Sequence, residues 1–200
     1  MIRSRMNAVT LLTIWMLCFV MPRLISAVSS AIVVNDLEGK SRTFFEGTNA
    51  SAKALVFIFV LPDCPICNSY VPELKRLARQ FPQIEFYRVY ADPEITKAAA
   101  RQHSSDYDFG FPGLLDPAQQ LVRKSGATRT PEAAVFSPGG KLLYRGRIDD
   151  RYTDFGKKRD RPRQHDLENA LRSILEKQPA RWPKAAPIGC FIPTKEKPVP

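Results

Sequence analysis

The stretch ALVFIFVLPDCPICNSYVPELKRLARQF, residues 54–81, decides the fold. Its first eight residues are an unbroken apolar run rich in β-branched and aromatic side chains, which predicts a strand buried on both faces. From Ile66 onward, apolar residues recur at helical spacing, and Pro72 inside this segment predicts a kink. The stretch therefore reads as strand, loop and helix, with Cys64 and Cys67 where the strand gives way to the helix.

The segments on either side predict a regular succession of strands and helices. We expect strands flanking a turn at 36–40, a strand at 84–91, helices at 92–104 and 117–126, an extended piece at 111–116, a hairpin at 132–149, a charged loop at 151–163 and an amphipathic helix at 164–177. Such an order predicts an α/β fold with a mixed central sheet, helices on both of its faces and an N-terminal β-hairpin.

The first 30 residues have the layout of a secretory signal. Two arginines precede an apolar run of 11 residues, and small residues follow it, so cleavage is expected after Ala27 or nearby. The run is short for a membrane span, although an uncleaved N-terminal anchor is the alternative. We therefore divide the chain into a signal (1–30), a domain (31–178) and a proline-rich, extended tail (179–200), and expect an exported, periplasmic or extracytoplasmic protein.

The net charge of +10 comes largely from residues after position 140, once the arginines of the signal are set aside. A basic surface can attract nucleic acid or an anionic membrane. Export excludes nucleic acid as a partner, and we interpret the excess as a solvated basic surface.

The spacing of the two cysteines suits a redox couple. A thiolate is the reactive form of cysteine, and helix geometry brings residues three apart within disulfide range. With Pro65 tolerated in the first turn, Cys64 is expected at the start of the helix as the exposed attacking thiol, and Cys67 as the more buried resolving thiol. Asp63 should raise the pKa of Cys64 through its charge, or else cap the helix.

Two other interpretations of the pair remain open at this point. Both cysteines could be ordinary buried side chains. A structural zinc site would need four ligands, and His103 and His165 show no paired spacing that would complete one. We therefore expect no resident cofactor.

These residues resemble the thioredoxin-fold redoxin group, which includes the alkyl hydroperoxide reductase/thiol-specific antioxidant family and the exported TlpA/ResA-type thiol-disulfide oxidoreductases. The resemblance covers about residues 31–150 and rests on DLEGK, on the stretch quoted above and on FPGLLDPAQQLVRKSGATRTPEAAVFSPGGKLLYRGRID. It implies a thioredoxin-like fold and a cis peptide bond between Thr130 and Pro131. These two residues would shape the groove where a thiol-bearing chain docks by strand addition.

The resemblance also implies partners and an activity. The protein would exchange disulfides with extracytoplasmic protein thiols and disulfides and be served by an upstream electron donor, with membrane association through an uncleaved N-terminal segment as an option. A thiol peroxidase is an alternative, but Leu61 stands where the peroxidatic motif of the group has Thr or Ser.

A third thiol keeps a second alternative open. DCPICNSYVPE, TPEAAV, YRGRIDDRY and GCFI together resemble a bacterial exported redoxin subgroup with a C-terminal Gly-Cys. In that subgroup Cys190 could pair with Cys64 in place of Cys67, act as a ligand, or simply anchor the tail. A Sco-like copper chaperone would use Cys64, Cys67 or Cys190 with a histidine, such as His103, which is otherwise expected at the helix surface.

Overall fold

The computed structural model describes residues 31–46, 51–178 and 186–194. The strands are β1 (Ile32–Asp36), β2 (Ser41–Phe44), β3 (Ala54–Val60), β4 (Ile84–Tyr90), β5 (Gly113–Leu115), β6 (Arg129–Thr130), β7 (Glu132–Phe136), β8 (Leu142–Gly146), β9 (Tyr152–Asp154), β10 (Lys157–Lys158) and β11 (Cys190–Phe191). The helices are α1 (Pro65–Ser69), α2 (Val71–Gln80), α3 (Lys97–Tyr107), α4 (Gln120–Ser125) and α5 (Asp166–Leu175). The predicted signal, residues 1–30, lies outside the described residues.

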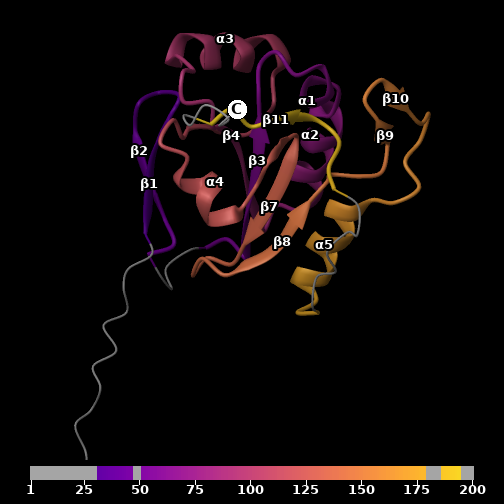
Figure 1. Cartoon of the computed structure of the whole chain (residues 1–200). Coiled ribbons are helices and arrows are strands. Elements are labelled where there is room, and N and C mark those ends of the chain that lie inside the picture. The colour runs from indigo at the N-terminus through magenta and orange to yellow at the C-terminus, as the bar shows by residue number, and fades with distance from the viewer. Residues whose placement is uncertain (1–30, 47–50, 179–185, 195–200) are drawn as a thin grey trace, which may run out of the picture.

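Seven strands form the central sheet in the order β2-β1-β5-β4-β3-β7-β8 (Figure 1). Strand β3 runs parallel to β4 and antiparallel to β7, so that Ile58 lies between Arg88 and Ala133. The β1–β2 hairpin joins the sheet through antiparallel pairing of β1 with β5. The predicted mixed sheet and N-terminal hairpin are therefore confirmed.

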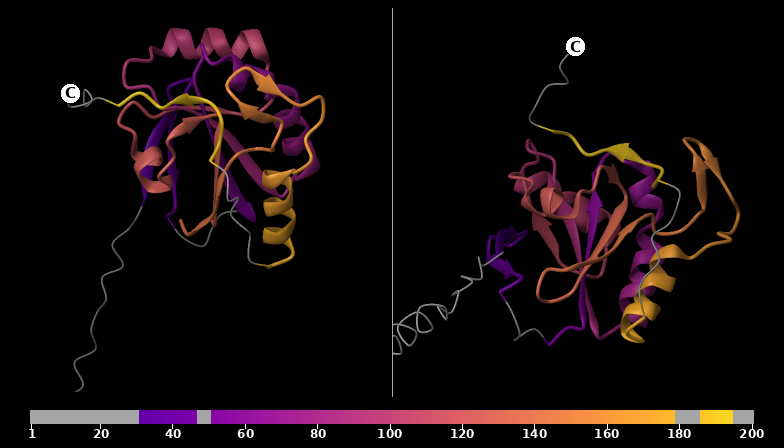
Figure 2. Two further views of the ribbon diagram at one scale, coloured as in Figure 1. Left: turned by 45° about the vertical axis from the view of Figure 1, so that its right-hand side comes forward. Right: turned by 60° about the horizontal axis from the view of Figure 1, so that its bottom comes forward.

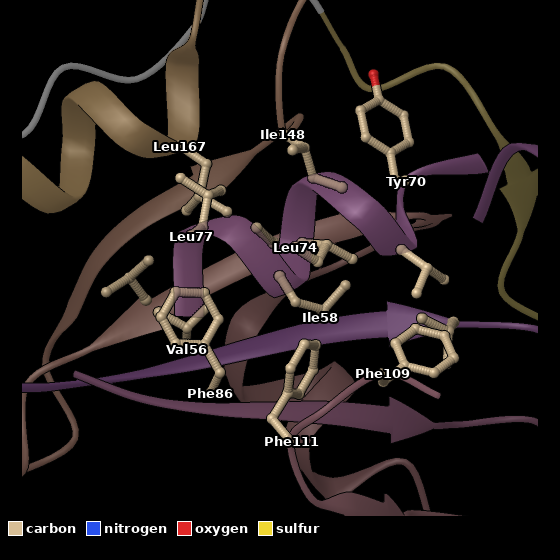
Figure 3. Packing of buried hydrophobic residues seen from close by; sticks show 14 of the residues in the cluster. Val56, Ile58, Tyr70, Leu74, Leu77, Phe86, Phe109, Phe111, Ile148 and Leu167 are labelled. Atoms are coloured by element: carbon tan, nitrogen blue, oxygen red, sulfur yellow. The ribbon is translucent and has the colours of Figure 1, made fainter. Parts of the chain in front are cut away.

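Strand β3 is buried along its whole length and feeds two apolar layers. Ala54, Val56, Ile58 and Val60 pack in the layer that also contains residues of α2 and α5, whereas Leu55, Phe57 and Phe59 pack with residues of α4 and the β1–β2 hairpin. Figure 3 shows Leu74 and Leu77 of α2 facing Ile58 and Val56 of β3. Helices thus cover both faces of the sheet, as the sequence predicts.

The helix predicted after Cys64 is divided in two rather than merely kinked. Helix α1 ends at Ser69, Tyr70 links the two pieces, and Pro72 lies in the first turn of α2. Proline has no N–H to donate and its ring clashes with the carbonyl four residues earlier, which here belongs to Asn68. The break therefore falls where the proline requires it, and it leaves α1 as a short separate turn that carries Cys67.

Two helices begin later than the sequence predicts, because side chains cap them at other positions. Helix α3 begins after Thr96, whose hydroxyl accepts a hydrogen bond of 3.1 Å from the amide of Ala99. Helix α4 begins after Gln119, and the carboxylate of Asp116 accepts 2.8 Å bonds from the first two amides of the helix. The prolines expected in the first turns, Pro93 and Pro117, lie in the preceding loops.

The segment expected as a charged loop, 151–163, contains the small β9–β10 hairpin. Figure 2 shows this hairpin projecting beyond the central sheet, beside the segment that carries β11. Its lysines, Lys157 and Lys158, are exposed, which agrees with the predicted solvated basic surface. Among the helices in the described part of the chain, none combines the length and the apolar character that crossing a membrane requires.

Candidate active site

The candidate site begins where β3 ends and α1 starts. Cys64 is the N-cap residue of α1, and Pro65 is the first helical residue. The amide of Cys64 donates a hydrogen bond of 3.2 Å to the carbonyl of Leu61. Proline is tolerated there because the first amides of a helix have no partner within it. The predicted position of Cys64 is therefore confirmed, and the capping role considered for Asp63 is wrong.

Cys64 is a buried thiol with a low pKa. Its pKa is lowered to about 4, above all by a hydrogen bond from the thiol of Cys67 and, against the opposing effect of burial, by the thiol of Cys190 and the backbone of both cysteines. Burial and the neighbouring Cys64 raise the pKa of Cys67. The expectation that Asp63 raises the pKa of Cys64 is wrong, because Asp63 is exposed while the thiol donors act directly on the sulfur.

The predicted cis peptide bond is present between Thr130 and Pro131. The carbonyl oxygen of Thr130 lies 3.4 Å from the sulfur of Cys64. Glu132, the next residue, is buried, and its carboxylate accepts hydrogen bonds from the amides of Thr128 and Arg129. This carboxylate holds the short strand β6 in place beside the thiol.

The tail returns to this strand and adds one of its own. Strand β11 pairs antiparallel with β6, with Cys190 opposite Thr130 and Phe191 opposite Arg129. The yellow segment in Figures 1 and 2 shows the tail crossing one end of the central sheet near α1. The sequence predicts an extended tail, but no pattern in it predicts pairing with β6.

The pairing brings a third thiol to the site. The sulfur of Cys190 lies 2.9 Å from that of Cys64, which is longer than the ~2.05 Å bond of a disulfide. Burial and the adjacent Cys64 raise the pKa of Cys190 to about 11. Cys64 keeps only 1% of its surface exposed, so the expected exposed attacking thiol is instead covered in this conformation.

An apolar groove of about 510 Å³ lies beside Cys190. It is lined by Pro65 and Ile66 of α1 and by the β9–β10 hairpin, whose Phe155 is exposed. The hydroxyls of Ser69 and Tyr152 lie 2.8 Å apart and tie the hairpin to α1. Cys190 thus borders an apolar groove that also includes Lys158, whereas Cys64 and Cys67 stay buried.

The histidines lie elsewhere than a copper site would need. His103 is buried, not at the surface as predicted. Its Nε2 lies 2.8 Å from Asn68 Oδ1, and its Nδ1 lies 2.9 Å from the hydroxyl of Tyr90. Burial, followed by the charge of Arg88, lowers the pKa of His103. Both ring nitrogens are thus already engaged, and His103 has no free nitrogen to offer to a metal held by the thiols.

His165 lies near Glu73 and Glu168 instead. In the residues that the structure describes, these three form the one group of metal-ligating side chains close enough to share an ion. Arg76 already forms ion pairs with both carboxylates. The cluster contains no cysteine and is accounted for as an ion-pair network between α2 and α5.

Sequence reasoning missed one supporting contact of the site. Tyr70, directly after α1, donates a hydrogen bond of 2.5 Å to the buried carboxylate of Asp149. Asp149 also pairs with Arg151 at 3.2 Å. The only sequence signal was the motif YRGRIDDRY, which places an acidic pair between basic residues without indicating its partner.

A match of residues 30–145 to a family model, described as AhpC/TSA family, covers more than half of the chain. The chain belongs to the AhpC/TSA family. This family member is 23% identical over 111 residues to thiol-disulfide oxidoreductase ResA of Bacillus thuringiensis subsp. konkukian. The match covers 56% of the chain and 62% of ResA, so the chain spans less than two thirds of that relative.

Solved structures identify the fold of this AhpC/TSA protein. It is similar to a hypothetical protein of Sinorhizobium meliloti, with a TM-score of 0.67, 24% identity and coverage of 82% of this chain and 91% of the other. It is also similar to a putative thioredoxin of Neisseria meningitidis, with a TM-score of 0.55, 21% identity and coverage of 76% and 91%. The predicted thioredoxin-like redoxin fold is therefore confirmed.

Proposed function

We propose that the protein is an exported thiol-disulfide oxidoreductase whose attacking group is the thiolate of Cys64. The observation that carries this proposal is a thiol whose pKa is lowered to about 4 by two neighbouring thiols, beside a cis-proline strand. A cysteine with such a pKa is ionised at neutral pH, whereas an ordinary cysteine with a pKa of about 8.5 is mostly protonated. The similarity to ResA supports the same reaction class.

In the first step, the Cys64 thiolate attacks one sulfur of a disulfide in an extracytoplasmic protein. A bond forms between Cys64 and that sulfur, the disulfide of the substrate breaks, and its second sulfur leaves as a thiolate that takes a proton from water. The backbone of Thr130, beside cis-Pro131, offers the edge along which the substrate chain adds as a strand.

In the second step, Cys67 attacks the sulfur of Cys64. The thiolate of Cys64 contributes to the raised pKa of Cys67. Because the mixed disulfide removes that negative charge, Cys67 becomes easier to deprotonate at the moment it is needed. A Cys64–Cys67 disulfide forms and the substrate leaves as a dithiol, so that the substrate gains two electrons and the protein loses two. An upstream dithiol donor then returns the protein to its reduced form.

Reduction of insulin by the full chain without its signal tests this proposal. Cys64→Ser should abolish activity, whereas Cys67→Ser should accumulate a mixed disulfide between Cys64 and the substrate, visible by non-reducing electrophoresis and mass spectrometry. Cys190→Ser is the matched control, because Cys190 forms no bond in either step and the serine hydroxyl can still donate a hydrogen bond to Cys64. Insulin reduction by Cys64→Ser at the wild-type rate would refute the proposal.

Export is the other part of the proposal, and the layout of residues 1–30 supports it. The mature N-terminus, determined from protein in the extracytoplasmic fraction, should follow Ala27 or a residue close to it. Retention of residues 1–30 on a membrane-bound product would favour the anchor instead of the cleaved signal.

A further inference from the structure

We propose that the tail segment Gly189–Ile192 occupies the docking groove in the manner of a substrate, and that the groove selects extended peptides in which glycine directly precedes the reactive cysteine. This inference rests on the proposed function, because it assigns a substrate class to the same thiol. It starts from the pairing of Cys190 with Thr130 and from the closeness of the Cys190 and Cys64 sulfurs, 2.9 Å apart.

The backbone of the tail makes the contacts that an added strand makes. The amide of Ile192 donates to the carbonyl of Thr128 at 3.1 Å, and the guanidinium of Arg129 donates to the carbonyl of Gly189 at 3.2 Å. Main-chain contacts of this kind give affinity to any extended peptide, whatever its sequence. Selectivity must therefore come from the side-chain positions.

Position 189 supplies that selectivity. A Cβ atom at Gly189 would lie 2.0 Å from the carbonyl oxygen of Thr130 and 2.7 Å from its carbonyl carbon. Both are backbone atoms next to Pro131, so no flexible side chain can move aside. The need for glycine is thus a matter of close approach between two backbones. Any residue with a side chain before the cysteine would push the strand away from Cys64.

The positions after the cysteine are less restrictive. The ring of Phe191 lies under the guanidinium of Arg129, 3.4 Å from its central carbon, yet the side chain remains 67% exposed. Ile192 is buried against the second apolar layer. An aromatic residue followed by an apolar residue therefore fits this surface, although neither position excludes other side chains as position 189 does.

The tail and a substrate cannot occupy the groove together. Cys190 has a raised pKa, stays protonated at neutral pH and is a poor nucleophile, so it can occupy the groove as a thiol beside the Cys64 thiolate. A substrate that displaces the tail places its own cysteine where Cys190 was. Cys64 then attacks that sulfur, a Cys64–substrate disulfide forms, and the previous partner of the substrate sulfur leaves as a thiolate.

Two octapeptides test the selectivity: APIGCFIP, which copies residues 186–193, and APIACFIP. Each carries its cysteine as a mixed disulfide with 5-thio-2-nitrobenzoate, which leaves as a coloured thiolate when Cys64 attacks the peptide sulfur. The protein is the reduced full chain without its signal, carrying Gly189→Ala so that its own tail leaves the groove and Cys67→Ser so that the disulfide between Cys64 and the peptide persists. We expect at least a tenfold faster release from the glycine peptide, with the peptide joined to Cys64 by mass spectrometry.

Alkylation of Cys64 by iodoacetamide provides the second measurement, because it needs no peptide. Gly189→Ala should react at least tenfold faster than wild type. Gly139→Ala should react like wild type, because a Cβ there meets no atom within 4 Å. Equal rates for both peptides, or unchanged alkylation in Gly189→Ala, would overturn the inference. Neither result touches the proposed function, which fails only if Cys64→Ser still reduces insulin.

Discussion

The thiol of Cys67 donates a hydrogen bond to the sulfur of Cys64, and this contact does more than any other to lower the pKa of Cys64. The two residues are separated by one turn of α1, a helix of only five residues. The reactivity of the site therefore depends on whether Cys67 carries its proton. Helix α1 ends at Ser69, just before Pro72 in the first turn of α2, so this contact lies within a short helix of its own.

The first prediction concerns the pH profile of Cys64. Because its pKa is lowered to about 4, roughly 90% of the Cys64 thiol is ionised at about pH 5 and nearly all of it above about pH 5.5. The rate of alkylation of Cys64 by iodoacetamide, followed by peptide mass spectrometry, should be nearly constant from about pH 5.5 to about pH 7.5. An ordinary thiol would instead react about tenfold faster for each pH unit in this range, and such a slope would contradict the low pKa.

The second prediction separates the hydrogen-bond donors. Cys67→Ala should raise the pKa of Cys64 most, because it removes the largest of the lowering contacts, and Cys190→Ala should raise it less. Cys67→Ser is the matched control, since its hydroxyl can still donate. The pKa of Cys64 in each variant is measured by following the thiolate absorbance near 240 nm as the pH is changed. A larger effect of Cys190→Ala than of Cys67→Ala would show that the donors are ranked wrongly.

The third prediction tests the support beneath α1. Tyr70→Phe removes the hydroxyl that bonds Asp149, a carboxylate with only 2% of its surface exposed. A buried acceptor that loses a partner costs about 1–3 kcal/mol in the free energy of unfolding. Urea denaturation measures the loss. Tyr87→Phe is the control, because the carboxylate of its partner Glu85 is exposed and water can replace the hydroxyl; equal losses in both variants would argue against a role for burial.

The fourth prediction follows from His103. Its pKa is lowered in the folded protein, so the unfolded chain binds more protons once the pH falls below about 6.5, and stability decreases as the pH falls toward the folded pKa. Between about pH 7.5 and about pH 5.5, wild type should therefore lose more free energy of unfolding than His103→Gln, by up to about 1.4 kcal/mol for each unit of pKa difference. A parallel loss in His103→Gln would contradict this assignment.

Much of the fold follows from local signals in the sequence. The apolar run that forms β3 and the proline that divides α1 from α2 act through their own neighbours, so periodicity and proline chemistry predict them. The first residues of α3 and α4, in contrast, could not be predicted from such local signals. There the side chains of Thr96 and Asp116 cap the helices, and they prevail over the prolines at 93 and 117.

In the candidate site, too, the features set by neighbouring residues could be predicted from the sequence, whereas those set by distant residues could not. The places of Cys64 and Cys67 follow from their spacing, and cis-Pro131 from a resemblance. The low pKa of Cys64 could not be predicted from its neighbour Asp63, because it depends on which groups point at the sulfur. The position of Cys190 depends on backbone pairing over a separation of 60 residues from Thr130, and no local pattern encodes such a contact.

The two sides of β3 differ in side-chain volume, and this difference fixes the register of the strand and therefore the position of the loop that follows. Val56 and Ile58 face one layer, whereas Phe57 and Phe59 face the other. A shift by one residue would exchange the two sets, overfilling one layer and leaving voids in the other. The position of Cys64 relative to the sheet thus depends on the side-chain volumes along β3. An insertion within β3 should therefore displace the thiol even where residues 64–67 are unchanged.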